Sequence, residues 1–370
     1  MKKILPACAV LLLLAGVSQP AMGQDEPTIV KDSIVFNAWT VNSYRKNFDI
    51  WSWLPQLQYR VNGPIASGSQ MYVEYTIPGA AAVKFDCPTG DTQKGYWWKT
   101  ECGGRGIPEE KAVTYVGPVS FTIKMRNELT GTNATLFSGK AQVAKVHSSE
   151  VGPKAINKWV YYVEHDWTLP MAYVFLEAVS VAGWNLPTFH VAFWVRGDQG
   201  NSIEPHLFYQ GKEVGKQFLD GTEVGKAGCG SELEINTTHF VDEKAAPQKA
   251  RWQRIGCTFY NVRGWDKTGE KSSGLFQPPH LLSANPGDYE FKALWKGRLA
   301  RTLKFTVAAD AKFDNGIASG FKLGSDRVIF PITVLGTEDG VWDRLAWKAG
   351  AFYGNPVPGF TAAAPAAAAK

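Results

Sequence analysis

Short runs of alternating polar and apolar residues dominate this chain. Residues 70–77 and 119–125 alternate in this way, and 304–307 is a shorter example. A period of two places the apolar side chains on one face of a β-strand, and β-branched and aromatic residues favour that conformation. Turn residues separate the runs at short intervals, as in the Asn-Gly-Pro of 62–64 and the Asn-Pro-Gly of 285–287. The pattern predicts a mainly β protein with many short strands.

Two stretches have the pattern of β-hairpins. Residues 121–137 are interrupted by a polar segment at 127–132, and residues 290–305 are interrupted around Lys296-Gly297-Arg298. In each case turn chemistry lies between two alternating runs. Both stretches are therefore expected to fold back on themselves.

Helical spacing is scarce. In residues 339–352 the apolar positions recur at intervals that suit one short amphipathic helix. Residues 241–254 are polar and contain alanine, and they fit either a helix or a loop. We therefore expect little helix in the fold.

The chain contains stretches that resemble each other. Residues 53–59 and 184–191 share an aromatic residue, a Leu-Pro step and alternating apolar positions, and 118–125 resembles 286–293. Each copy also contains one close pair of cysteines. Similarity at such a long period indicates duplicated structural units. We expect two tandem immunoglobulin-like β-sandwich units.

The length of 370 residues suits two domains. We place the boundary in the turn-rich segment 148–156, so that the first unit covers 24–152 and the second covers 153–355. If the strands after residue 158 instead complete the first unit, the boundary moves close to residue 180. The Ala- and Pro-rich segment 356–370 is expected to be a disordered tail.

Residues 1–23 have the pattern of a secretory signal peptide. Lys2 and Lys3 precede an apolar run at 7–17, and small residues follow at Ala21 and Gly23. The run is shorter than the roughly 20 residues that span a bilayer. Cys8 is not a convincing lipid-attachment cysteine, because the apolar run follows it. We expect export to the bacterial periplasm or the cell exterior, with no membrane span.

Four cysteines remain after the signal peptide. Cys87 and Cys102 lie close together in the sequence, as do Cys229 and Cys257. In an oxidising compartment these pairs favour two local disulfides, one in each unit. A four-cysteine zinc site is less consistent with the spacing, because it lacks a C-x-x-C pair. We therefore expect disulfides and no metal.

Charge excludes one class of partner. Without Lys2 and Lys3, 37 basic residues face 34 acidic ones, and no run of clustered Lys or Arg is present. This balance does not favour nucleic-acid binding. A protein or a glycan is the expected partner.

Catalytic and cofactor motifs are absent from the sequence. His165 and His206 have nearby carboxylates, but neither has the spacing of a metal site or a catalytic pair. No nucleophile elbow, dinucleotide motif or phosphate loop is present. We predict no catalytic residues and no cofactor, and binding is favoured over catalysis.

Aromatic residues near the cysteines are the candidate ligand contacts. Tyr96, Trp97 and Trp98 lie between Cys87 and Cys102, and Trp252 lies between the other two cysteines. Exposed rings in these loops would contact a sugar or a protein. Alternatively, they fill the core beside a disulfide. Three more distant tryptophans are expected in the core: Trp265, Trp342 and Trp347.

These observations favour a secreted, non-enzymatic protein that binds a partner or forms part of the cell envelope or surface. The alternative is a carbohydrate-binding or carbohydrate-processing protein that uses the loop aromatics. A third hypothesis is a periplasmic assembly factor that acts through a free sheet edge.

The disulfide assignment predicts the result of peptide mapping. Under non-reducing conditions, Cys87 should be linked to Cys102, and Cys229 to Cys257, because short loops in separate units close most easily. A peptide that joins Cys87 to Cys229 or Cys257 would contradict the assignment of one bridge to each unit.

Overall fold

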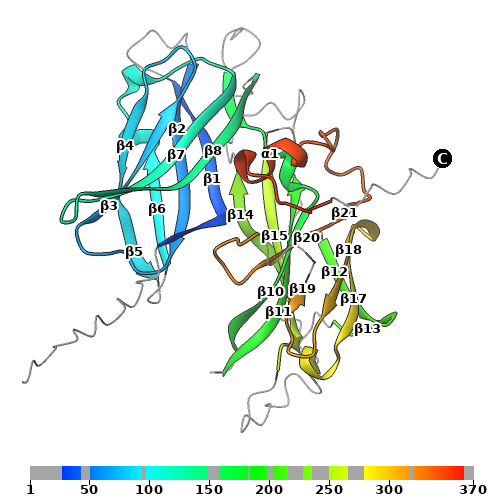
Figure 1. Cartoon of the computed structure of the whole chain (residues 1–370). Coiled ribbons are helices and arrows are strands. Elements are labelled where there is room, and N and C mark those ends of the chain that lie inside the picture. Colours follow the sequence, from blue (N-terminus) through cyan, green and yellow to red (C-terminus); the bar gives the residue numbers. More distant parts are fainter. Residues whose placement is uncertain are drawn as a thin grey trace, which may run out of the picture.

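The computed structural model describes residues 27–42, 51–93, 97–147, 159–181, 184–197, 203–215, 228–235, 250–265, 279–314, 316 and 321–361. Within these ranges the protein is mainly β, as the alternating pattern predicts. The strands form four sheets, which pack in pairs as two β-sandwiches. Figure 1 shows the first sandwich in blue to teal and the second in green to orange, with α1 between them.

The first sandwich consists of a four-stranded and a five-stranded sheet. The four-stranded sheet has the order β1 (Thr28–Asn42), β2 (Trp51–Asn62), β6 (Trp97–Gly103), β5 (Thr89–Gln93). The five-stranded sheet has the order β4 (Val83–Cys87), β3 (Ser69–Thr76), β7 (Gly117–Asn127), β8 (Thr132–His147), β9 (Trp159–Val163). Apolar side chains from both sheets are buried between them. The Cys87–Cys102 disulfide joins β4 to β6 and therefore links the two sheets.

The second sandwich also consists of two sheets. One has the order β20 (Val328–Pro331), β10 (Met171–Val181), β11 (Trp184–Arg196), β15 (Trp252–Arg263), β14 (Gly228–Ile235), with β16 (His280–Leu281) parallel to β15. The other has the order β13 (Lys212–Glu213), β12 (Ile203–Tyr209), β17 (Gly287–Trp295), β18 (Arg298–Val307), β19 (Phe313–Asp314), with β21 (Thr333–Val334) also on β18. Short 3₁₀ turns lie at Gly104–Gly106, Glu109–Lys111, Asp166–Thr168 and Leu282–Ala284.

The two disulfides match the predicted cysteine pairs but differ in structural role. Cys229 and Cys257 are directly opposite each other on the neighbouring strands β14 and β15 of one sheet. The Cys87–Cys102 bond instead crosses between two sheets. Each sandwich thus contains one bridge, but Cys87 lies on the sheet that faces the sheet of its partner, whereas Cys229 lies on the same sheet as its partner.

Both predicted hairpins are confirmed. Strands β7 and β8 pair from Gly117 opposite Val143 to Asn127 opposite Thr132. Strands β17 and β18 turn between Trp295 and Arg298, which are opposite each other. Each turn has the chemistry that the sequence indicates, because Gly131 and Gly297 adopt positive φ angles of 67° and 75°.

Strands β10, β11 and β15 have both faces buried over most of their length. On β11, Phe189, Val191 and Phe193 point into the second sandwich, whereas Ala192 and Trp194 belong to the core of the first. Side chains alternate across a strand, so one sheet contributes to two cores. Such strands are apolar on both faces. The two sandwiches therefore share a largely apolar interface.

A cluster of charges, in which Arg254 and Asp32 are buried, crosses this interface. Arg254 of β15 donates from Nε to Glu232 Oε2 at 2.9 Å and from Nη1 to the carbonyl of Asp32 at 2.7 Å. Arg327 also reaches Glu232 Oε2, at 2.9 Å. Burial alone would raise the pKa of Glu232, but the two guanidinium groups lower it. Two arginines and two carboxylates therefore hold four parts of the chain together: β1, β14, β15 and the segment before β20.

The C-terminal segment returns to the first sandwich. Leu323 and Gly324 accept hydrogen bonds from Lys31 and Asn62, at 2.7 and 3.2 Å. The helix expected at 339–352 is shorter and later, because α1 covers Trp347–Gly354 and has non-helical angles from Ala351 to Tyr353. The reason is tertiary: buried aromatic residues there pack into the first core.

Two further expectations need correction. Val357 and Phe360 are buried, so the tail expected to be disordered from 356 is ordered to at least residue 361, and 362–370 lie outside the described residues. Trp265 was expected in the core but is 47% exposed. The boundary segment 148–156 lies outside the described residues. After it, β9 pairs with β8 of the first sandwich, and the chain enters the second sandwich at β10.

Trp252 provides a test of the shared interface. Its side chain is fully buried between the sandwiches, so Trp252→Ala should lower the free energy of unfolding by about 3 to 5 kcal/mol. Trp265→Ala is the matched control, and its exposed ring should contribute only about 0.5 kcal/mol. Urea denaturation measures both. Equal effects of the two substitutions would contradict the interface described here.

Candidate functional site

The aromatic residues predicted to bind a ligand do not form one site among the described residues. Trp252 is fully buried, stacks on Tyr162 with ring centroids 6.2 Å apart, and lies 5.0 Å from the Arg196 guanidinium. It is a core residue and offers no open ring face. Tyr96 lies outside the described residues, as do the side chains of Trp97 and Trp98 on β6. Their contact with a ligand stays a prediction.

The two histidines with nearby carboxylates have different surroundings. His206 lies on β12 and contacts Glu213 Oε1 at 2.6 Å on the surface. His165 is fully buried, and its Nδ1–H donates to the carbonyl of Val163 at 2.9 Å. Its Nε2 faces the hydroxyl of Tyr353, also at 2.9 Å. Neither residue forms a catalytic pair in this arrangement.

A groove of about 1010 Å³ lies between the first sandwich and the C-terminal segment. One wall is the outer face of the sheet formed by β7, β8 and β9, where polar side chains alternate with buried apolar ones. The residues that line this wall include Ser120, Thr122, Ser138, Lys140, Gln142 and Tyr162. Ser120 is opposite Lys140 and Thr122 is opposite Ser138, so hydroxyl and amino groups lie in a row across two strands.

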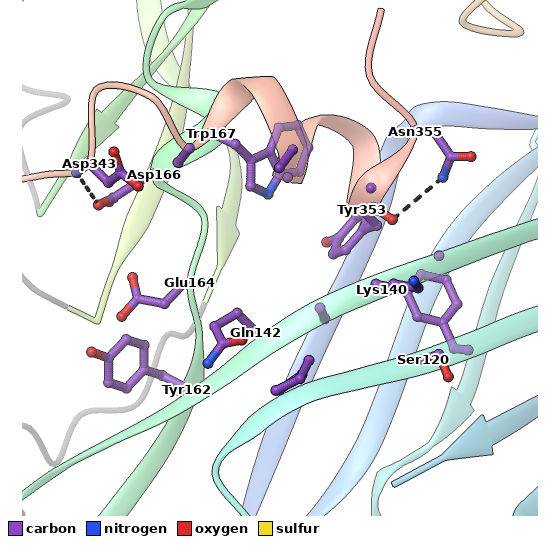
Figure 2. A pocket seen from close by; sticks show the side chains of 18 of the residues that line it. Ser120, Lys140, Gln142, Tyr162, Glu164, Asp166, Trp167, Asp343, Tyr353 and Asn355 are labelled. Carbon is purple, nitrogen blue, oxygen red and sulfur yellow. Dashed lines mark hydrogen bonds between the residues drawn. The ribbon is translucent and has the colours of Figure 1, made fainter. Parts of the chain in front are cut away.

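The opposite wall comes from the C-terminal segment. It includes Trp342, Ala346, Ala349 and Asn355, with Trp167 beside them. Asn355 fixes this wall to the sheet, since its Nδ2 donates to the carbonyl of Ser138 at 2.9 Å. Figure 2 shows Trp167 and Tyr353 between the two ends of the groove.

Left-handed backbone angles occur next to this wall. Phe352 and Tyr353 have φ angles of 44° and 58°, which are unfavourable for residues with a side chain. Burial offsets this cost, because Phe352 packs against Phe321 and Trp167 with centroids 4.9 and 5.5 Å away. The hydroxyl of Tyr353 accepts from the amide of Phe36 at 2.9 Å. The wall is therefore held by contacts beneath it.

The groove has an acidic end. Glu164, Asp166 and Asp343 lie together at one side of Figure 2, whereas Lys140 and Asn355 lie at the other. Glu164 and Asp166 are two residues apart, and His165 between them points into the core. This end is therefore acidic because the chain leaves β9 with alternate side chains facing the groove.

Asp166 is the most buried of these carboxylates. Its Oδ2 accepts from the amide of Asp343 at 2.9 Å, and its Oδ1 lies 3.7 Å from Nη1 of Arg196. Burial raises the pKa of Asp166, although Arg196 opposes that shift. Nη1 of Arg196 donates to the carbonyl of Val341 at 2.6 Å. Asp166 and Arg196 thus fix the start of the C-terminal wall.

Burial also raises the pKa of the Tyr162 phenol, and the neighbouring Glu164 carboxylate adds to this effect. Tyr162 is therefore a neutral hydroxyl at physiological pH and can donate or accept a hydrogen bond. The neighbouring carboxylates accept hydrogen bonds, and the side-chain amide of Gln142 can both donate and accept them. The groove offers a mixed set of polar partners together with aromatic rings.

Within the described residues, no group of three or more His, Cys, Asp or Glu side chains is arranged to hold a metal ion. In the same part of the chain, no helix is long and apolar enough to cross a membrane.

No protein-family model matches the sequence, and no curated protein is similar to it.

Sequence reasoning did not identify this groove. It singled out His165 because carboxylates flank it, yet the flanking residues Glu164 and Asp166 face the groove. A signal was present, since positions 162, 164 and 166 share one face of an alternating stretch. The opposite wall could not be found in this way, because Trp342 and Asp343 are far away in the sequence.

His165 predicts a loss of stability in acid. Burial lowers its pKa from 6.5 to about 4 in the folded protein, so the unfolded chain binds the proton more readily. Stability should therefore fall as the pH decreases from 6.5 towards 4, by about 3 kcal/mol. His165→Gln should make this dependence shallower, as measured by urea denaturation across that range. His190, whose pKa burial also lowers to about 4, should keep part of the slope. An unchanged profile in His165→Gln would contradict the assignment.

Proposed function

We propose that this is an exported, non-enzymatic binding protein that holds a glycan in the groove. The observation that carries the proposal is that one wall of the groove is polar and the other is aromatic. A row of hydroxyl, amide and amino groups on β7 and β8 lines the same groove as Trp342 and Trp167. Sugars present hydroxyl groups at their edges and C–H groups on their ring faces, so they suit a site with both kinds of partner.

Trp342 is the aromatic residue best placed to contact a sugar ring. The guanidinium of Arg344 lies 4.9 Å from the centre of its ring. Trp342 lines the groove between two exposed residues, Val341 and Asp343. A sugar that stacks here would reach the polar wall with its hydroxyl groups.

Export is part of the proposal and rests on two observations. The sequence pattern of a signal peptide occupies residues 1–23, which lie outside the described residues. The structure contains two disulfides, which persist in oxidising compartments such as the bacterial periplasm or the cell exterior.

We also propose that the two sandwiches arose by internal duplication. The sheet order β1-β2-β6-β5 corresponds to β10-β11-β15-β14, and β4-β3-β7-β8 corresponds to β13-β12-β17-β18. Pro55 of β2 and Pro187 of β11 are opposite Ala38 and Ala178 of the preceding strand. The resemblance of each unit to an immunoglobulin domain remains a prediction.

Carbohydrate processing is a second candidate function. Glu164 and Asp166 line the same groove, and hydrolysis of a glycosidic bond uses two carboxylates, one of them with a raised pKa. Burial raises the pKa of Asp166, as a general acid requires. Binding is preferred, because Asp166 is already engaged by Asp343 and Arg196.

Filling the groove tests the proposal. Ala349→Trp places a large ring in the groove, whereas Lys348→Trp places the same ring on the neighbouring exposed position outside it. Wild-type protein should bind members of a glycan array, with a change in tryptophan fluorescence on titration. Ala349→Trp should weaken binding at least about tenfold, and Lys348→Trp should leave it nearly unchanged.

The same titrations contain the outcomes that would reject the proposal. Absence of glycan binding by the wild type, or equal binding by both tryptophan variants, would exclude a glycan site in this groove. Circular dichroism checks that the variants fold. Chromatography of the glycans after incubation should recover them intact, and cleavage that Asp166→Asn abolishes would establish the processing function instead.

A further inference from the structure

We propose that the Cys229–Cys257 disulfide is an exchange site for small thiols, and that its opening loosens the contact between the two sandwiches. This inference concerns the second sandwich and does not depend on the groove. It is carried by the position of Cys229 on an edge strand, by the exposure of its side chain, and by the contacts that the rest of β14 makes.

The two disulfides differ in their access to solvent. Cys87 and Cys102 are both buried, at 3% and 0% exposure. In the other bridge Cys257 is fully buried, but Cys229 is partly exposed. Cys229 lies on the last strand of its sheet, because among the described strands β14 pairs only with β15. A thiolate must reach a sulfur atom to attack it, so Cys229 is the sulfur that a thiol reaches in the folded protein.

The strand around Cys229 is suited to local opening. Gly228 and Gly230 flank this cysteine, and glycine weakens a strand because it has no side chain to pack. A β-bulge follows, since the register with β15 shifts between Ser231 and Leu233. Segments of this kind open at a lower free energy than core strands do. Exchange at Cys229 therefore does not require the whole protein to unfold.

The exchange takes two balanced steps. The thiolate of one small thiol attacks Sγ of Cys229, the bond to Cys257 breaks, and Cys257 leaves as a thiolate that takes up a proton. A second thiolate attacks the small thiol's sulfur in this mixed disulfide and releases Cys229, which is protonated in turn. The protein gains two electrons and two protons, and two thiol molecules are oxidised to their disulfide.

Opening the bridge affects the interface because β14 contacts both cores. Cys229 packs against the core of the second sandwich, whereas Ile235 is buried in the core of the first and Leu233 packs against that core. These three residues are separated by even numbers of positions, so in a regular strand they would share one face. The bulge turns the second half of β14 towards the first sandwich. β14 thus ties the sandwiches together, and the disulfide fixes its first half to β15.

Reduction of the folded protein tests the exchange site. The wild type is incubated with reduced glutathione and quenched with acid, and its free thiols are alkylated and mapped by mass spectrometry. The Cys229–Cys257 bridge should open at least about tenfold faster than the Cys87–Cys102 bridge, at a rate proportional to the glutathione concentration. The first adduct should carry glutathione on Cys229 and a free thiol on Cys257.

Hydrogen exchange measures the effect on the interface. Reduction should raise the exchange rate of the backbone amides of 231–235 about tenfold and leave those of β3 and β7 unchanged. Cys229→Ser combined with Cys257→Ser should show the same faster exchange without any thiol. Cys87→Ser combined with Cys102→Ser is the matched control, because it removes the buried bridge. In that variant β14 should stay protected until glutathione is added.

Three results would overturn the exchange site. The first is resistance of the Cys229–Cys257 bridge to glutathione, and the second is a first adduct on Cys257. The third is reduction of both bridges together at a rate independent of thiol concentration, because exchange would then wait for global unfolding. If the bridge opens as expected but amide exchange at 231–235 does not change, the exchange site stands and its effect on the interface is rejected.

Discussion

Strands β10, β11 and β15 are buried on both faces over most of their length, so the charged groups that they bury need partners inside the protein. Arg254 meets Asp32 and Glu232, and Arg196 meets Asp166 and the backbone of Val341. Unpaired, each of these charges would be costly to bury. The partners come from β1, β14, the turn after β9 and the C-terminal segment, so the requirement for pairing fixes how these parts are placed.

The groove is a consequence of that placement. The guanidinium of Arg196, at the end of β11, lies beside Asp166 and the backbone of the C-terminal segment. That segment then lies across the outer face of β7 and β8 and leaves a space between them. The site is composed of residues from both sandwiches and from the last described part of the chain. It is complete only when all three are assembled.

The alternating pattern predicted the β class, the two hairpins and, with the cysteine spacing, the local disulfides. It could not show which apolar face of a strand points to which core. Trp252 therefore resembled a loop residue near a cysteine, although it lies in the interface between sandwiches. The left-handed angles at Phe352 and Tyr353 oppose local preference and exist only because distant contacts stabilise them. The same is true of the groove, whose walls are joined by contacts that no local pattern encodes.

The hydrogen bond between the amide of Phe36 and the hydroxyl of Tyr353 joins residues 317 positions apart. Contacts of such long range raise the contact order, which slows folding. During synthesis the N-terminal part of a chain emerges first. In this protein the first sandwich must wait for Phe352 and Tyr353 before its core is filled and the ring of His165 has its second partner. A chain that stops short of residue 353 therefore lacks part of its N-terminal core, even though every strand of that sandwich has been made.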